Sequence, residues 1–256
     1  MPENRFAALS RAADGLAPDQ ALIGDLFQIV ETLRDNPALR RALTDTTLDP
    51  GDRGRLAERL FGQRIGSAAV GLLSAAAAMD WRSGFELADA LETQGVRIGV
   101  RSGDPAAVRD ELGACARLIS GTAQIEQAFS MHGSGPHDRA ALMTRLLGSR
   151  VSAATHALIR HAARRGGRVG RTIARYEEIA SGVLGRRLAR VTVARPLPAD
   201  QAERLKEQLG RVYATPVDLS VRIDPDVLGG VHVRIGDEVI DGTIATILDQ
   251  ARRQLA

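Results

Sequence analysis

Aromatic residues are scarce in this chain of 256 residues. Phenylalanine, tyrosine and tryptophan together make up 3% of it, so the core has to be built from leucine, isoleucine, valine and alanine. Because alanine and leucine are strong helix formers, this composition favours packed helices over a β-sandwich. We therefore expect a mainly α-helical fold with a smaller β part.

Cysteine and long apolar runs are scarce as well. Cys115 is the only cysteine, which excludes an intrachain disulfide and is compatible with a reducing compartment. The longest apolar run, 68–79, is shorter than the ~20 residues that a helix needs to cross a bilayer. The first ten residues lack the pattern of an export signal. We expect a cytoplasmic protein that reaches a membrane only through partners.

Lysine is represented by Lys206 alone, and the basic residues are nearly all arginine. The 34 basic residues are balanced by 31 acidic ones, so the net charge of +3 does not by itself indicate nucleic acid. One group of arginines stands out: Arg160, Arg164, Arg165, Arg168, Arg171, Arg175, Arg186, Arg187 and Arg190. It can be interpreted as a nucleic-acid face or as a solvated face beside an acidic partner. Because no stacking aromatic residues accompany it, we favour the second interpretation.

The upstream part of the chain consists of short amphipathic segments. Helices are expected over 4–16, 22–33, 38–44, 65–79 and 85–96, with a further helix around Leu56 and Leu60. Because the loops between them are only a few residues long, the pattern predicts a helical bundle.

A second bundle follows, at an offset of 86 residues from the first, the separation of Pro50 and Pro136. Identical residues recur at this offset without a gap: Asp52 and Arg53 at Asp138 and Arg139, Arg59 and Leu60 at Arg145 and Leu146, Gly62 at Gly148, Leu72 at Leu158, and Glu92 at Glu178. We interpret this as an internal duplication, with copy one over 1–100 and copy two over 101–185. Because 4–16 has no clear counterpart before Pro105, copy two is expected to borrow a helix or to lack one. Cys115 falls on an apolar stripe of copy two and is expected to be buried.

Residues 186–256 have a different character. Apolar and polar residues alternate over 217–223 and over 231–235, which predicts two strands of a hairpin joined through 224–230. With a strand over 190–194 and a helix over 200–213, this gives a small α+β domain on a three-stranded sheet. After a turn at Gly236 and Asp237, we expect Asp241 to cap a C-terminal helix that begins near Gly242.

The spacing within 224–242 resembles the C-terminal signature of the delta subunit of bacterial F-type ATP synthases, the family of the mitochondrial oligomycin-sensitivity-conferring protein. The matching residues are Asp224, Pro225, Gly229, Gly230, Val233, Gly236, Asp237, Val239, Asp241 and Gly242. The duplicated bundle is similar to the long actinobacterial form of this family. The resemblance implies a non-catalytic stator subunit of the peripheral stalk, which links the catalytic head to the membrane-anchored b subunit so that rotation is coupled to ATP synthesis.

The resemblance also implies two partners and a place in the cell. In this family the helical bundle binds the N-terminal helix of an α subunit, and the C-terminal domain binds the end of the b subunit, at the cytoplasmic face of the cell membrane. A groove between bundle helices accepts an amphipathic helix through regularly spaced apolar anchors. We expect such a groove in copy one, with Phe6, Leu9, Leu16, Leu72 and Leu73, although each of these can equally be a core residue. Which copy binds the α subunit stays open.

Sequence motifs for catalysis or for metal binding are lacking. Gly229 and Gly230 do not belong to a phosphate-binding glycine pattern, and His156 and His161 have the wrong spacing for two metal ligands on one helix face. The sequence therefore predicts neither an enzyme nor a metal or cofactor. The alternative to a stator is a basic helical module that binds nucleic acid or a regulatory partner.

Overall fold

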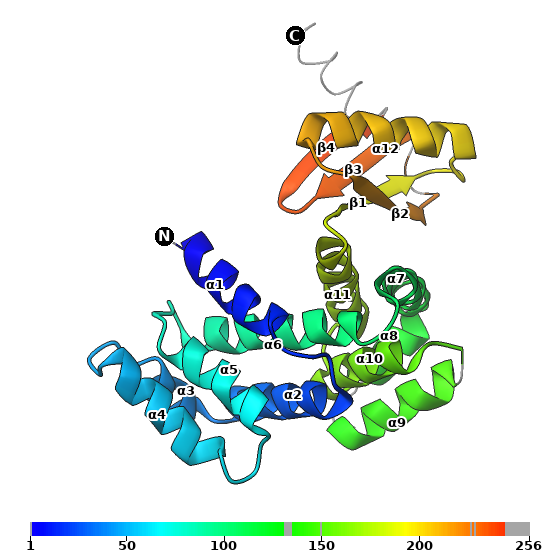
Figure 1. Cartoon of the computed structure of the whole chain (residues 1–256). Helices are drawn as coiled ribbons and strands as arrows, with labels where there is room; N and C mark the ends of the chain where they lie inside the picture. The colour runs from blue at the N-terminus through cyan, green and yellow to red at the C-terminus, as the bar shows by residue number, and fades with distance from the viewer. Residues whose placement is uncertain (1, 131–134, 149, 226, 228, 244–256) are drawn as a thin grey trace, which may run out of the picture.

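The computed structural model describes residues 2–130, 135–148, 150–225, 227 and 229–243 (Figure 1). The first part of the chain is helical, as predicted: α1 (Pro2–Asp14), α2 (Gln20–Asp35), α3 (Pro37–Leu43), α4 (Pro50–Phe61), α5 (Ser67–Ala77), α6 (Gly84–Arg101), α7 (Pro105–Ser120), α8 (Ala123–Ser130), α9 (Pro136–Leu147), α10 (Ala153–Arg165) and α11 (Val169–Val183). No helix within the described ranges is long and apolar enough to span a membrane.

The helices of the structure repeat at the offset on which the predicted duplication rests. Helices α2 to α6 recur in order as α7 to α11, and α4 and α9 begin and end at residues 86 apart. A buried contact recurs with them, because Arg53 Nε donates to the Ala77 carbonyl at 2.9 Å and Arg139 Nε donates to the Ala163 carbonyl at 3.1 Å. In each copy this arginine closes the C-terminal end of the helix that it contacts.

A second contact also recurs at the same offset, at the other end of those helices. Asp25 Oδ2 accepts a hydrogen bond from the Gly66 amide at 2.9 Å, just before α5. Glu111 Oε2 accepts one from the Ser152 amide at 3.0 Å, just before α10. Since a carboxylate at a helix N-terminus satisfies a free amide, both copies fix the start of this helix in the same way.

Helix α6 belongs to both copies. Shifted by the same offset, α1 falls on residues 88–100, which lie inside α6. Accordingly, α1 packs against α5 and α6, and α6 packs against their counterparts α10 and α11. At Gly99 a Cβ would come within 2.6 Å of Leu158 Cδ2, so a side chain there would collide with α10. Copy two therefore borrows α6 as its first helix, and one hydrophobic core runs through both copies.

The C-terminal part is an α+β unit that lies beyond α7 and α11 in Figure 1. It contains β1 (Arg187–Val193), α12 (Ala199–Tyr213), β2 (Val217–Ile223), β3 (Gly230–Ile235) and β4 (Glu238–Thr243). The strand order is β2-β1-β3-β4, with β1 parallel to β2 and antiparallel to β3. Helix α12 lies along the sheet in Figure 1, and its Leu209 joins a second hydrophobic core with Val191 and Val233.

Three predictions about this unit are wrong. The sheet has four strands rather than three, and β1 lies between β2 and β3, so those two strands do not form a hairpin. The hairpin is β3–β4, which turns at Gly236 with a positive φ of 58°. Asp241 pairs with His232 inside β4, which continues to Thr243, so a helix does not begin at Gly242; the β-branched Val239 and Ile240 favour the strand. The helix expected after Gly242 lies outside the described residues.

Candidate partner-binding surfaces

The predicted groove residues of copy one divide between the core and its edge. Leu9, Leu72 and Leu73 are buried in the hydrophobic core, whereas Phe6 and Leu16 are half-buried and pack against it. The ring of Phe6 lies edge-on to Trp81, with 5.6 Å between the ring centroids. The edge residues Phe6 and Leu16 are therefore the ones accessible on this face, while the three buried leucines hold the bundle together.

Small apolar side chains line the outer side of α5 near α1. Ala75 is half-exposed, as are Ala78 and Met79, the first two residues after the helix. Gly71, one turn earlier, is exposed, and a Cβ there would meet nothing within 4 Å. Because these side chains are short, the backbone of a second helix can approach α5 closely. The sequence reasoning chose the larger leucines and missed these residues, although the alanine run of α5 was visible.

A buried carboxylate lies where the two copies meet. Glu92 of α6 is 1% exposed and accepts hydrogen bonds from Arg34 at 2.9 Å, Arg165 at 2.9 Å and the Tyr176 hydroxyl at 2.6 Å. These donors come from α2, α10 and α11. Burial by itself would raise the pKa of Glu92, but the adjacent His161, the charge of Arg165 and the Tyr176 hydroxyl outweigh it and hold the pKa far below its usual range. Glu92 thus ties four helices together as an anion.

A second ionic cluster joins the helical body to the sheet. Asp218 of β2 is buried, and its carboxylate accepts from Arg186 at 2.7 Å and from Arg109 of α7 at 2.5 Å. Arg190 of β1 donates to Glu178 of α11 at 3.1 Å. Since the two hydrophobic cores form separate clusters, these directed charge pairs fix the orientation of the sheet on the helices.

The arginine group predicted as a basic face is largely engaged inside the molecule. The acceptors are Glu31 for Arg164, Glu92 for Arg165, Thr93 for Arg175, Asp218 for Arg186 and Glu178 for Arg190. In addition, Arg187 lies over the ring of Tyr213, at 5.0 Å from its centroid. Because four of these nine guanidinium groups pair with carboxylates, a large part of their charge is compensated inside the molecule and is not free to contact phosphates. The structure gives no support to a nucleic-acid face.

The signature residues form turns and strands of the sheet. The Asp224 amide donates to the Val193 carbonyl at 2.9 Å, and Gly229 and Gly230 have φ values of 126° and 84°, which suit glycine. Val233 is buried between Val191 and Ile240 on the neighbouring strands. Gly236 and Asp237 form the β3–β4 turn, and Val239, Asp241 and Gly242 lie in β4. Their spacing is therefore explained by the fold of this sheet.

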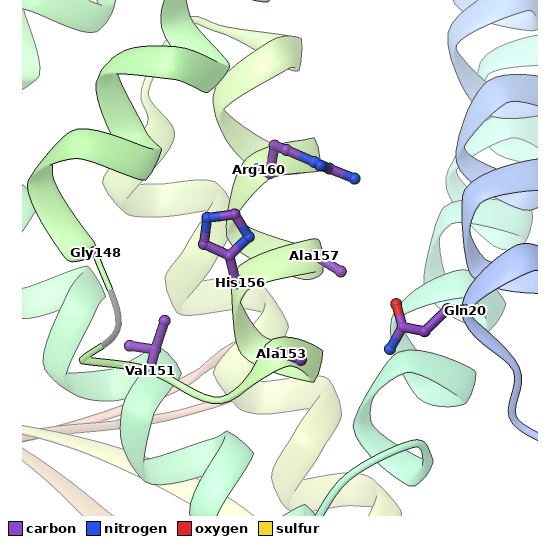
Figure 2. Close-up of a pocket in the computed structure, with 7 residues that line it drawn as sticks. All are labelled: Gln20, Gly148, Val151, Ala153, His156, Ala157 and Arg160. Carbon is purple, nitrogen blue, oxygen red and sulfur yellow. The ribbon is translucent and has the colours of Figure 1, made fainter.

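A hollow lies between the start of α2 and the outer face of α10 (Figure 2). The lining residues are Gln20, Gly148, Val151, Ala153, His156, Ala157 and Arg160. In Figure 2 the side chains of Gln20 and Arg160 extend from opposite helices into the gap. The lining holds no carboxylate or thiol, and nowhere in the described part of the chain do three or more His, Cys, Asp or Glu residues gather as metal ligands. The lining of the hollow therefore offers no set of metal ligands.

Cys115 is buried in copy two, as predicted from its apolar stripe. Burial, with a smaller effect of Glu111, raises the pKa of its thiol to about 11. Because only the thiolate reacts, we expect Cys115 in the folded chain to react with a disulfide reagent at pH 7.5 at least about a hundredfold more slowly than in denaturant. A thiol titration measures this, and equal rates in both states would contradict the burial of Cys115.

Comparison with known proteins gives one consistent result. Residues 95–255 match the family model described as the ATP synthase delta (OSCP) subunit. An ATP synthase subunit delta of Nocardioides sp. is 38% identical over 92% of this chain and 87% of its own length. The ATP synthase subunit delta of Acidothermus cellulolyticus is 37% identical over 97% of this chain and 93% of its own length. A chain of the Toxoplasma gondii mitochondrial ATP synthase hexamer is a weak structural match, with a TM-score of 0.39 and 15% identity over 64% of this chain and 94% of that one.

The match to the family model begins inside α6. It therefore covers copy two and the C-terminal unit, and copy one lies before it. The two relatives, in contrast, match nearly the whole chain and so include both copies.

Proposed function

The chain belongs to the ATP synthase delta (OSCP) subunit family and is a non-catalytic peripheral-stalk subunit of the F-type ATP synthase, and we propose that it binds two other subunits at its opposite ends. The first is the N-terminal helix of an α subunit, at copy one. The second is the C-terminal end of the b subunit, at the α+β unit. A stator must hold the catalytic head still while the shaft turns, so it needs two separated attachments and no chemistry of its own.

One observation supports this role above all others: the two helical copies and the sheet are joined to one another by a shared helix and by charge pairs. The two helical copies share α6 and one core, Glu92 ties four helices together, and Asp218 ties the sheet to α7. In Figure 1 the sheet lies at one end and α4 at the other. Two attachments on such a body raise the effective concentration of each, so moderate affinities give a long-lived joint.

The attachment to the head uses the outer side of α1 and α5. The half-exposed side chains there, Phe6, Ala75, Ala78 and Met79, are apolar and sit beside a closely packed helix pair. An amphipathic helix can cover them with an apolar stripe in the manner of other helix-in-groove complexes. Leu9 and Leu72 support this face from the core.

The attachment to the stalk uses β4 and the end of α12. β4 is an edge strand, and its Val239 is 55% exposed, while Val212 near the end of α12 is 74% exposed. The Tyr213 hydroxyl donates to Glu238 at 2.6 Å, which joins the end of α12 to the start of β4. Exposed apolar side chains around an edge strand of the described sheet suit a protein partner. Through this contact the chain is held peripherally at the cytoplasmic face of the cell membrane.

Full-length variants test the two ends separately. We expect the tagged wild-type chain to recover both α and b subunits from detergent-solubilised membranes. Ala75→Arg places a charge in the head contact and should lower α recovery about tenfold or more while b recovery is unchanged. Val239→Glu should do the reverse, because it places a charge in the stalk contact.

The control for the stalk variant is Ile223→Glu, on the opposite edge strand β2, where an isoleucine is similarly exposed. It should retain both partners. Recovery of nucleic acid, or of neither subunit, with the wild-type chain would contradict the proposal.

A further inference from the structure

The duplication sets up two equivalent helix pairs in one chain. At the offset of 86 residues, α1 and α5 of copy one correspond to α6 and α10 of copy two. Both pairs are in contact. If an α1–α5 pair forms a groove for a helix, the α6–α10 pair forms a second groove by the same geometry. Whether a partner can enter that second groove depends on what already covers α6 and α10.

Helix α2 lies on the second pair. It packs along α6, where Phe27 approaches Gly95 so closely that a Cβ on this glycine would lie 2.9 Å from Phe27 Cε1. The same phenylalanine ring stacks on His161 of α10, with 3.8 Å between centroids and 5° between ring planes. One large apolar side chain of α2 thus sits between α6 and α10, as an anchor of a docked helix does.

Ion pairs reinforce this position of α2. Glu31 accepts from Arg164 of α10 through both carboxylate oxygens, each at 2.9 Å. Arg34, one turn later, donates to Glu92 of α6 at 2.9 Å. Both pairs are partly shielded from solvent, and Arg34 also pairs with Asp89 of α6, so several charge pairs hold α2 to α6 and α10.

We infer that α2 is the permanent occupant of the groove of copy two, so that each chain binds one partner helix and binds it at copy one. This inference rests on the proposed function and adds its stoichiometry and its site. The family model matches copy two, yet in this chain the open groove belongs to the copy that precedes the matched residues. The duplication has converted one docking groove into an internal joint.

The side chains of the two grooves differ in a way that specifies the occupant. In copy two, Glu92, His161 and Arg164 contact α2, and Arg165 pairs with Glu92. Their counterparts in copy one are Phe6, Ala75, Ala78 and Met79, all half-exposed and apolar. A helix like α2, which carries a glutamate in this contact, therefore fits copy two. The occupant of copy one must instead present a continuous apolar stripe.

Beside this contact, the hollow of Figure 2 lies between the start of α2 and the outer face of α10. Gln20, at the start of α2, and Arg160 extend into it, beside Ala153 and Ala157 of α10. Polar side chains from both walls therefore stand where an apolar stripe would have to lie. Ala157 is half-buried on this wall, one turn before His161, and provides a matched control position for Ala75.

The test is isothermal titration of the full-length chain with a synthetic peptide of the α-subunit N-terminal helix from the same organism. We expect one peptide per wild-type chain. Ala75→Arg should raise the Kd about tenfold or more, whereas Ala157→Arg should change it by less than about twofold. Circular dichroism and thermal unfolding of both variants establish that each is folded.

Different outcomes overturn different claims. Two peptides per chain, or a loss of binding in Ala157→Arg with none in Ala75→Arg, would overturn the closed groove and leave the stator function intact. No binding of the peptide to the wild-type chain would overturn the proposed α-subunit contact, and this inference with it.

Discussion

Replacing Glu92 by alanine should lower the free energy of unfolding by about 3–5 kcal/mol, the cost of breaking a buried charge cluster by removing one partner. The substitution leaves Arg34 and Arg165 without their common anion and removes the acceptor of the buried Tyr176 hydroxyl. Chemical denaturation followed by circular dichroism measures the change. Because Glu92 contacts α2, α10 and α11, the loss should also loosen the joint between the two copies.

The internal duplication supplies the matched control. Glu178 occupies the position of Glu92 in copy two, and its side chain is 40% exposed while it pairs with Arg190. A half-exposed ion pair contributes at most about 1 kcal/mol, so Glu178→Ala should be mild. Equal losses in the two variants would contradict the central role of Glu92.

The acid dependence of stability, compared between the wild-type chain and Glu92→Ala, gives a second test of Glu92. The folded-state pKa of Glu92 is lowered below the usual glutamate value of about 4.3. Its contribution to stability is therefore complete above that pH and is lost as the pH falls toward the folded-state pKa. Between about pH 4.3 and pH 3, the wild-type chain should lose more stability than Glu92→Ala does. An identical slope would show that Glu92 is not the anion described.

Replacing Asp218 by alanine should release the sheet from the helical body. Asp218 accepts from Arg109 of α7 and from Arg186 next to β1, so its removal leaves Arg186 without its acceptor and Arg109 with the exposed Asp110 alone. We expect the free energy that holds the sheet against the helices to fall by about 3 kcal/mol. Since Arg186 and Arg187 follow Gly185, trypsin should cut there at least about tenfold faster than in the wild-type chain, as local opening becomes more frequent.

Asp110→Ala is the control for this experiment. Asp110 also pairs with Arg109, at 2.7 Å, but its side chain is 69% exposed. Its removal should change the rate of cleavage by less than about twofold, because an exposed pair is screened by solvent. Unchanged cleavage in Asp218→Ala would mean that the sheet is held by other contacts.

The helical part could be predicted from the sequence because its signals are local and repeated. Amphipathic spacing marked the helices, and identical residues 86 apart, such as Pro50 and Pro136, revealed the duplication. The sequence also carried a signal for the sharing of α6, because α1 falls inside α6 when it is shifted by the same offset of 86 residues. The sequence predicted only that copy two borrows or lacks its first helix. Periodicity shows which side chains share a helix face, but it does not show which helix packs against that face.

The sheet was harder for a physical reason. Alternation over 217–223 shows that one side of the strand is buried, but it carries no information on which strand pairs with it. The partner of β2 is β1, across α12, and not the next strand in sequence. Asp241 and Gly242 resemble a helix cap locally, and only the pairing of β4 with β3 shows that they belong to a strand.

The candidate surfaces were predicted in outline and corrected in detail. Copy one was expected to hold the groove, and Leu9, Leu72 and Leu73 were proposed for it because they are large and apolar. The structure places all three in the core and leaves shorter side chains such as Ala75 at the edge. Glu92 drew attention only as a repeated residue, since amphipathic spacing alone does not distinguish a buried, paired glutamate from a solvated one.

The most direct test of the two-ended stator is a bridging experiment with purified components. Immobilised b subunit is incubated with the catalytic head, with and without this chain, and the bound α subunit is measured. We predict that b retains the head only when the chain is present, and that Ala75→Arg and Val239→Glu each abolish retention while Ile223→Glu does not. Retention of the head without the chain, or binding of the chain to b without recovery of the head, would contradict the bridge.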